Sequence, residues 1–216
     1  MLKAIYFDLD GTLVDTLPLY VKAYDKALKN QGFYFNDKEI VKNCFSKTEK
    51  TICSNLGIIS KTKEFTNDYF SGVKNFYNKA KLFDNVTEIL DFTKEKELEL
   101  VIISFAYRWY VDKMVEKLNL SKYFKLVIGF DDIKRAKPDP EAVLKACDEL
   151  EINSNEALVI GDSKNDVIMG NAVNAQTVLF HPDNYDLFYD IEDLKKSNPS
   201  SIIQNLKELK RILNHI

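Results

Sequence analysis

Short apolar segments alternate with amphipathic helical patterns through much of this chain, and this rhythm restricts the folds that it can adopt. The segment 98–103 is almost wholly apolar, and helical patterns precede it at 86–96 and follow it at 108–118. Further strand-like segments lie at 4–7, 126–128, 157–160 and 177–180, with helical patterns at 140–150 and 166–173. Apolar strands separated by helices are typical of a mostly parallel sheet with helices on both faces. The sequence therefore predicts an α/β fold with a three-layer α/β/α core.

The stretch from about residue 16 to residue 82 breaks this rhythm. It contains no convincing strand, and its apolar residues recur at helical spacing. The helical patterns lie at 17–32, 37–45, 48–56 and 61–79. We therefore expect an all-helical domain, residues 16–82, inserted into a core that consists of residues 1–15 and 83–216. A last helical pattern, at about 199–214, has one apolar side and is expected to pack against the core.

The composition is that of an ordinary globular protein and argues against several classes of function. The formal net charge of -3 does not favour a nucleic-acid partner. No apolar run approaches the roughly 20 residues that span a bilayer, and the first residues lack the layout of a signal peptide. The three cysteines are odd in number and widely spaced, which suits a reducing compartment. We therefore expect a cytoplasmic protein with no nucleic-acid or membrane partner.

Carboxylates are the candidate catalytic groups, because the chain contains only two histidines. Asp8 and Asp10 stand one residue apart, directly after the apolar segment 4–7. Buried charge is unfavourable unless it is paired or bound to a metal, so two acids at the end of a buried strand point to a site. Gly11 permits a sharp turn there, and Thr12 adds a hydroxyl group. Taken alone, the motif is equally consistent with an Asp-Gly turn that carries solvated acids.

Other polar residues lie where further strands are predicted to end. Ser104 follows the segment 98–103, Asp162 follows 157–160, and Asp166 opens the next helix. Lys137 stands just before the helix at 140–150. Each has an ordinary explanation, since serines and aspartates often cap helices and most lysines are solvated. Parallel strand ends share one edge of a sheet, however, so these residues can converge on one site.

At these residues the sequence resembles the haloacid dehalogenase-like (HAD) hydrolases. The resemblance rests on DLDGT at 8–12, the strand that ends at Ser104, KPDP at 137–140 and GDSKNDVIMG at 161–170. The four motifs occur in the family's order over nearly the whole chain. The resemblance implies a Rossmann-like core. It also implies that the helical insert is a small cap, as in phosphoglycolate phosphatase-like and β-phosphoglucomutase-like members.

The resemblance also implies roles for the four acids. Asp8 would attack phosphorus and form an aspartyl-phosphate, which divides one displacement into two. Asp10 would protonate the leaving alcohol and then activate the water that releases phosphate. Asp8, the backbone carbonyl of Asp10 and Asp162 would bind Mg²⁺, with Asp166 as a further ligand or a support for the site.

The remaining candidates would bind the phosphate group or the rest of the substrate. Thr12 and Ser104 would hold phosphate oxygens, and Lys137 would stabilise both the nucleophile and the transition state. Lys47 lies in a cap stretch, Ser46 to Glu49, that weakly resembles the phosphoglucomutase cap, and its alternative is ordinary surface exposure. Arg108, four residues after Ser104, is a second candidate for substrate contact, or it only covers its neighbour Trp109.

Three functions remain open at this point. The leading one is Mg²⁺-dependent hydrolysis of a small-molecule phosphate monoester, as in phosphoglycolate phosphatase-like proteins. The alternative is a sugar phosphomutase of the β-phosphoglucomutase type, which would return the phosphate to a bound sugar. A third is an inactive phosphate-binding regulatory protein, although the intact set of acids and lysine speaks against it. The expected partner is a phosphorylated metabolite, and the expected state is a monomer or weak homodimer.

Overall fold

The computed structural model describes residues 1–215, apart from the side chains of Phe76 and Tyr77. The described chain divides into two compact units. The first consists of Met1–Val14, Leu82–Asn184 and the chain from Asp190 onward, and the second consists of Asp15–Lys81 together with Tyr185–Tyr189.

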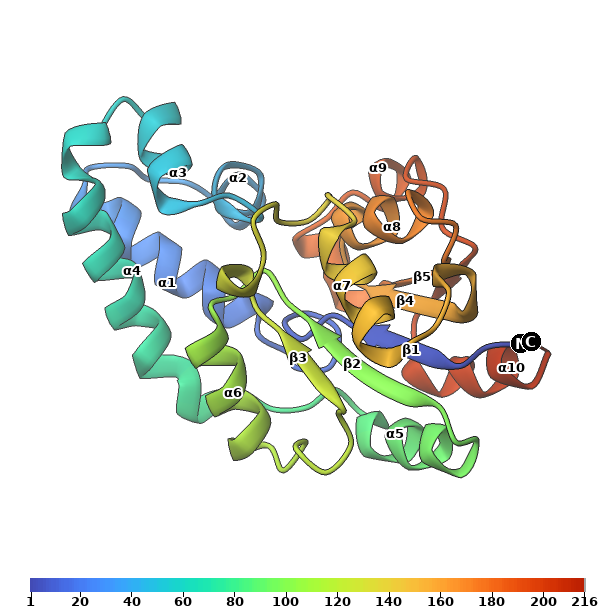
Figure 1. Ribbon diagram of the computed structural model, residues 1–216. Helices are drawn as coiled ribbons and strands as arrows, with labels where there is room; N and C mark the ends of the chain where they lie inside the picture. Colours follow the sequence, from blue (N-terminus) through green and yellow to red (C-terminus); the bar gives the residue numbers. More distant parts are fainter. Residues whose placement is uncertain (216) are drawn as a thin grey trace. The chain divides into compact units, whose positions relative to one another are not determined.

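A six-stranded sheet forms the centre of the first unit (Figure 1). Its strands lie in the order β3-β2-β1-β4-β5-β6, and every neighbouring pair is parallel. The strands are β1 (Ala4–Phe7), β2 (Glu99–Ile103), β3 (Leu126–Ile128), β4 (Ala157–Gly161), β5 (Gln176–Phe180) and β6 (Ser201–Ile203). The predicted α/β class with a parallel sheet is therefore confirmed.

Helices cover both faces of this sheet and complete the α/β/α layers (Figure 1). One layer contains α5 (Val86–Glu95), α6 (Arg108–Lys117) and α10 (Leu209–His215), and the other contains α7 (Glu141–Leu150), α8 (Lys164–Asn171) and α9 (Ile191–Lys195). Residues of β1 alternate between the two faces: Tyr6 joins a core cluster that includes residues of α7 and α8, whereas Phe7 packs edge-to-face on Phe124.

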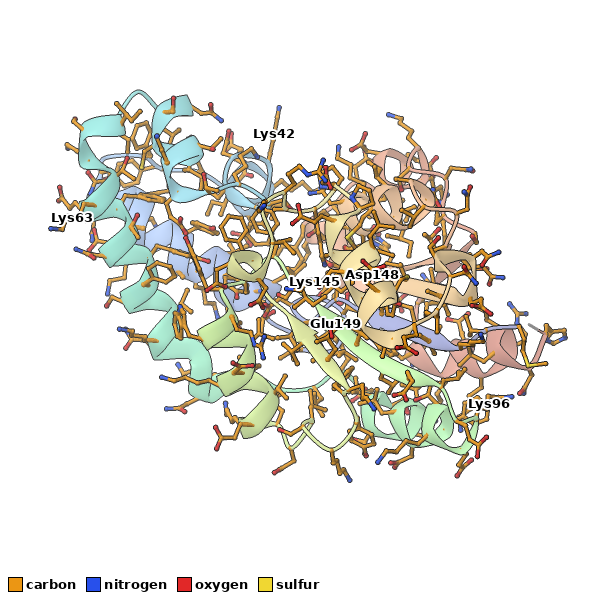
Figure 2. All side chains as sticks on the ribbon, in the orientation of Figure 1. Lys42, Lys63, Lys96, Lys145, Asp148 and Glu149 are labelled. Carbon is orange, nitrogen blue, oxygen red and sulfur yellow. The ribbon has the colours of Figure 1, made fainter. Side chains whose placement is uncertain are left out.

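Helix α7 shows how the sequence pattern produces this layering. Ala142, Val143 and Ala146 are fully buried in the core cluster beneath the helix. Asp148 and Glu149 lie on its exposed side (Figure 2). The helix therefore buries one apolar stripe against the sheet and keeps its charges in water.

The prediction for the C-terminal region was wrong. In place of one helix over about 199–214, the chain forms the strand β6, the 3₁₀ turn η6 (Leu206–Glu208) and then α10. Ser201, Ile202 and Ile203 pair with Val178, Leu179 and Phe180 of β5. The β5 edge offers backbone partners to this β-branched segment, and Asn205 caps the turn that follows by accepting a hydrogen bond from Lys207 N.

The second unit contains the helices of the inserted stretch. They are α1 (Leu17–Asn30), α2 (Asp37–Cys44), α3 (Glu49–Asn55) and α4 (Thr62–Phe76), with the 3₁₀ turns η1 (Ile59–Lys61) and η2 (Tyr77–Lys79). Tyr24 of α1 stacks on Tyr69 of α4 with ring centroids 4.2 Å apart, and Phe65 and Ile52 are fully buried. The unit therefore has an aromatic core of its own.

None of the helices in the described part of the chain is long and apolar enough to span a membrane. The three cysteines are buried and carry free thiols.

Candidate active site

The register of the sheet brings the strand ends to one level. Phe7, the last residue of β1, lies opposite Ile102 of β2 and Ile160 of β4. The next residue, Asp8, therefore stands level with Ile103 and Gly161, one position before Ser104 and Asp162. Asp8 continues the pairing through its backbone N–H, which donates to Ile160 O at 2.8 Å. In a parallel sheet this carboxyl edge is where ligands bind.

Lys137 connects two of these strand ends with the start of α8 (Lys164–Asn171). Its ammonium group donates to Asp8 Oδ1 at 2.7 Å, to Ile103 O at 2.6 Å and to Asp166 Oδ1 at 2.6 Å. Asp8, Lys137 and Asp166 are 8%, 7% and 2% exposed, so the network is largely removed from water. The lysine therefore joins the residue that follows β1, the last residue of β2 and an acid of α8.

The carboxylate of Asp8 is held in an unfavourable environment for charge. Burial raises its pKa to about 7, and the nearby acids Asp166 and Asp10 add to this, while Lys137 lowers it. For Lys137, burial alone would lower the pKa, but the Asp166 and Asp8 carboxylates outweigh it and raise the pKa above its ordinary value. The lysine is therefore charged, and Asp8 needs more positive charge nearby to stay ionised at neutral pH.

The turn after β1 shapes the floor of the site. Gly11 has φ +90°, a left-handed conformation that favours glycine, and its N–H donates to Val14 O at 2.8 Å. A Cβ atom on Gly11 would lie 2.5 Å from Asp162 Oδ2, so the Asp162 carboxylate packs directly over this glycine. Thr12 is fully buried, and its hydroxyl oxygen has no hydrogen-bond partner among the described residues. This hydroxyl group remains available to a ligand.

The start of α8 fixes Asp166. Asp166 Oδ2 accepts hydrogen bonds from Ser163 N and Ser163 Oγ, as part of a capping box, while Oδ1 accepts from Lys137. Both oxygens therefore already have protein donors. A Cβ atom on Gly161 would overlap the Asp166 carboxyl group, so the close approach of strand and helix requires glycine there.

The loop after β2 positions Ser104. Ser104 is 3% exposed, its N–H donates to Ile128 O at 2.9 Å, and its hydroxyl oxygen accepts from Ala106 N at 3.1 Å. Arg108 anchors the same loop: its guanidinium group donates to Asp112, to Val127 O and to Asp132. Lys113 Nζ lies over the Trp109 ring, 5.6 Å from its centroid. The structure thus assigns Arg108 to loop anchoring, and its contact with substrate stays a prediction.

Lys47 belongs to the second unit, and its ammonium group donates to Lys42 O at 2.6 Å within that unit. The preceding residue, Ser46, has φ +55°. The role of Lys47 toward a substrate stays a prediction.

Sequence reasoning missed Tyr110. This residue of α6 is 3% exposed, and its hydroxyl group donates to Asp10 Oδ1 at 3.0 Å. In the sequence Tyr110 is one of several apolar residues on a helix, and its partner lies 100 positions away. No local signal distinguishes it from an ordinary core tyrosine.

The donor set suits Mg²⁺. Among the residues that the structure describes, no three Asp, Glu, His or Cys side chains gather as a complete metal-binding group. Mg²⁺ does not need such a group, since it retains several waters and is commonly held by one or two carboxylates together with a phosphate. Asp8 and Asp162 could supply the carboxylates and Asp10 its carbonyl oxygen, and the Thr12 hydroxyl, which has no partner among the described residues, is a hydrogen-bonding group left for an oxygen-rich ligand.

The fold is that of an α/β protein whose candidate site, at the carboxyl edge of the sheet, contains carboxylates and a buried lysine. The chain belongs to the haloacid dehalogenase-like hydrolases: the family's model matches residues 5–180.

Relatives match over nearly the full length of the chain. Pyrophosphatase PpaX from Oceanobacillus iheyensis is 28% identical over 215 residues, covering 96% of this chain and 95% of the relative. A phosphoglycolate phosphatase from Aquifex aeolicus is 29% identical, with 94% and 96% covered. A solved haloacid dehalogenase-like family hydrolase from Streptococcus pneumoniae superimposes with a TM-score of 0.82 at 22% identity, covering 98% of both chains, and shows the same fold.

Proposed function

We propose that this protein is a Mg²⁺-dependent phosphatase that hydrolyses a small-molecule phosphate monoester through an aspartyl-phosphate on Asp8. The observation that carries the proposal is the buried network in which Lys137 joins Asp8 and Asp166 at the carboxyl edge of the sheet. Family membership and the phosphatase names of the relatives support the same reaction class.

In the first step, a carboxylate oxygen of Asp8 attacks phosphorus, and the bond from phosphorus to the leaving oxygen breaks. The electron pair goes to the leaving oxygen, which takes a proton from Asp10. Lys137 holds the Asp8 carboxylate in place and offsets the negative charge that accumulates as the two anions meet. Thr12 and Ser104 supply hydroxyl groups to the phosphate oxygens.

In the second step, water attacks the phosphorus of the aspartyl-phosphate. Asp10, now a carboxylate, accepts a proton from that water, and the bond between phosphorus and Asp8 breaks. Both acids return to their starting states, so the cycle is closed with phosphate and alcohol as products.

Asp8, the Asp10 carbonyl group and Asp162 would hold Mg²⁺, which supplies the positive charge that the nucleophile needs. The raised pKa of Asp8 supports this assignment, because a second cation beside the carboxylate favours its ionised form. Asp166 would support the site through Lys137, since both of its oxygens accept hydrogen bonds from the protein. The helical unit 15–81 would select the substrate, with Lys47 as a candidate contact.

The test is release of inorganic phosphate from p-nitrophenyl phosphate, pyrophosphate, 2-phosphoglycolate and β-glucose 1-phosphate. We expect release that requires Mg²⁺, stops on chelation and is inhibited by Ca²⁺, which is larger and could engage both oxygens of Asp8. Asp8→Asn is the control, with an expected loss of more than about 1,000-fold, because the amide is a poor nucleophile of similar shape. Full activity after chelation, or in Asp8→Asn, would refute the mechanism. Conversion of glucose 1-phosphate to the 6-phosphate without phosphate release would establish the phosphomutase alternative instead.

A further inference from the structure

One hydrogen bond reaches the proposed acid–base residue from outside the four motifs. Tyr110 OH donates to Asp10 Oδ1 at 3.0 Å, from helix α6 to the turn after β1. Both residues belong to the first compact unit. Tyr110 is 3% exposed, whereas Asp10 is only partly buried. The contact therefore joins a rigid core side chain to a carboxylate at the edge of the site.

The hydrogen bond from Tyr110 bears directly on the orientation of the Asp10 carboxylate group. The last torsion of an aspartate joins an sp³ carbon to an sp² carbon, and its energy profile is broad. A hydrogen bond to one oxygen selects one orientation of the group. Tyrosine is suited to this, because it has few rotatable bonds, and Tyr110 is further held by the edge-to-face contact with Trp109, at 6.1 Å between centroids.

We propose that Tyr110 is a positioning residue that orients Asp10 for proton transfer. Tyr110 holds Oδ1, and the carboxyl group oriented in this way gives its proton to the leaving group and later takes one from water. This inference rests on the proposed phosphatase function. Tyr110 itself touches neither substrate nor phosphorus.

Substrates with different leaving groups separate this role from a structural one. An alkoxide must be protonated as it leaves, whereas p-nitrophenolate is stable without a proton. A misplaced Asp10 should therefore slow the cleavage of an alkyl phosphate far more than that of p-nitrophenyl phosphate. The value of kcat/KM reports the steps through departure of the leaving group. We therefore expect Tyr110→Phe to lower kcat/KM for an alkyl phosphate by about 10- to 100-fold, and for p-nitrophenyl phosphate by less than about threefold.

Tyr123→Phe is the matched control. Tyr123 is 6% exposed and its hydroxyl group donates to Asp91 Oδ1 at 2.7 Å, so the substitution removes the same kind of bond away from the site. We expect Tyr123→Phe to change kcat/KM only slightly, and equally for both substrates. Thermal unfolding of the two variants measures the structural part of each substitution.

A second measurement tests whether Tyr110 acts through Asp10. If it does, Tyr110→Phe should have no further effect on alkyl phosphate hydrolysis in an Asp10→Asn background. Equal losses on both substrates in Tyr110→Phe, or a full additional loss in the double variant, would overturn the inference. Absence of phosphatase activity in the unmodified protein would instead overturn the proposed function, so the two failures are distinguishable.

Discussion

Replacing Lys137 by methionine should destabilise the protein strongly at neutral pH. Methionine has a similar length but no charge and no donor. The substitution would leave the buried carboxylates of Asp8 and Asp166 next to each other without the cation that now separates them. It would also remove the donor to Ile103 O.

The expected loss of unfolding free energy follows from the contacts that Lys137 makes. Lys137 makes hydrogen bonds of 2.7, 2.6 and 2.6 Å, and bonds to charged groups contribute about 1.5–3 kcal/mol each. Bringing the ammonium group out of water costs several kcal/mol, which offsets part of this gain. Because the substitution also strands two buried acids, we expect a loss of about 3–5 kcal/mol, as is found when one partner of a buried ion pair is removed.

The assay is urea unfolding at pH 7.5 and at pH 5, in the presence of a chelator. Lys137 lowers the pKa of Asp8, so its loss raises that pKa further above the present value of about 7. The destabilisation should therefore be smaller at pH 5, where Asp8 is protonated in both proteins and needs no cation. Lys210→Met serves as the control, since Lys210 pairs with Glu88 at 2.8 Å on the surface, where an ion pair contributes little to stability. A Lys137→Met protein as stable as the unmodified one at pH 7.5 would refute the reasoning.

Three further results are expected. The pKa of Asp8 is raised from 3.8 to about 7, so the free energy of unfolding of the metal-free protein should fall by up to about 4 kcal/mol as pH rises through this range. Asp8→Asn should flatten this fall. Urea midpoints from pH 4 to pH 8 measure it, and an unchanged slope in Asp8→Asn would contradict it. Gly161→Ala should lower kcat about tenfold or more on p-nitrophenyl phosphate, because the added methyl group overlaps the Asp166 carboxyl group and displaces it from Lys137. Undiminished turnover would show that Asp166 is not needed to hold the lysine. Lys47→Ala should lower kcat/KM on the physiological substrate and spare p-nitrophenyl phosphate, which needs few contacts with the helical unit; equal losses on both would place its effect in folding.

The parallel sheet and its site were predictable because the relevant signals are local. Each central strand is a nearly continuous apolar run, and Asp8, Ser104 and Asp162 directly follow three of them. In parallel strands this position always falls on the same edge, so convergence follows from the pattern alone. What the pattern could not supply was the partner of each group. Lys137 bridges Asp8 and Asp166, which lie 129 and 29 positions away from it in the sequence, and this contact depends on side-chain directions that the pattern does not encode.

The errors have the same origin. The apolar residues Ile202 and Ile203 fit a helical stripe, yet they form β6 because β5 presents an open edge. Tyr110 has the spacing of a core residue, yet its hydroxyl group reaches Asp10. In each case a neighbour distant in sequence decides the outcome, and periodicity reports burial but not the identity of the neighbour.

The Lys137 network ties the site to the integrity of the core. Its partners come from the end of β1, the end of β2 and the start of α8, which follows β4. These contacts can form together only when β1 lies between β2 and β4, the central arrangement of the sheet. The environment of the proposed nucleophile, Asp8, is therefore assembled by the same strand pairing that builds the hydrophobic centre. A partly unfolded protein that lost either neighbour of β1 would keep the DLDGT motif intact and still lack the Lys137 ammonium group beside Asp8.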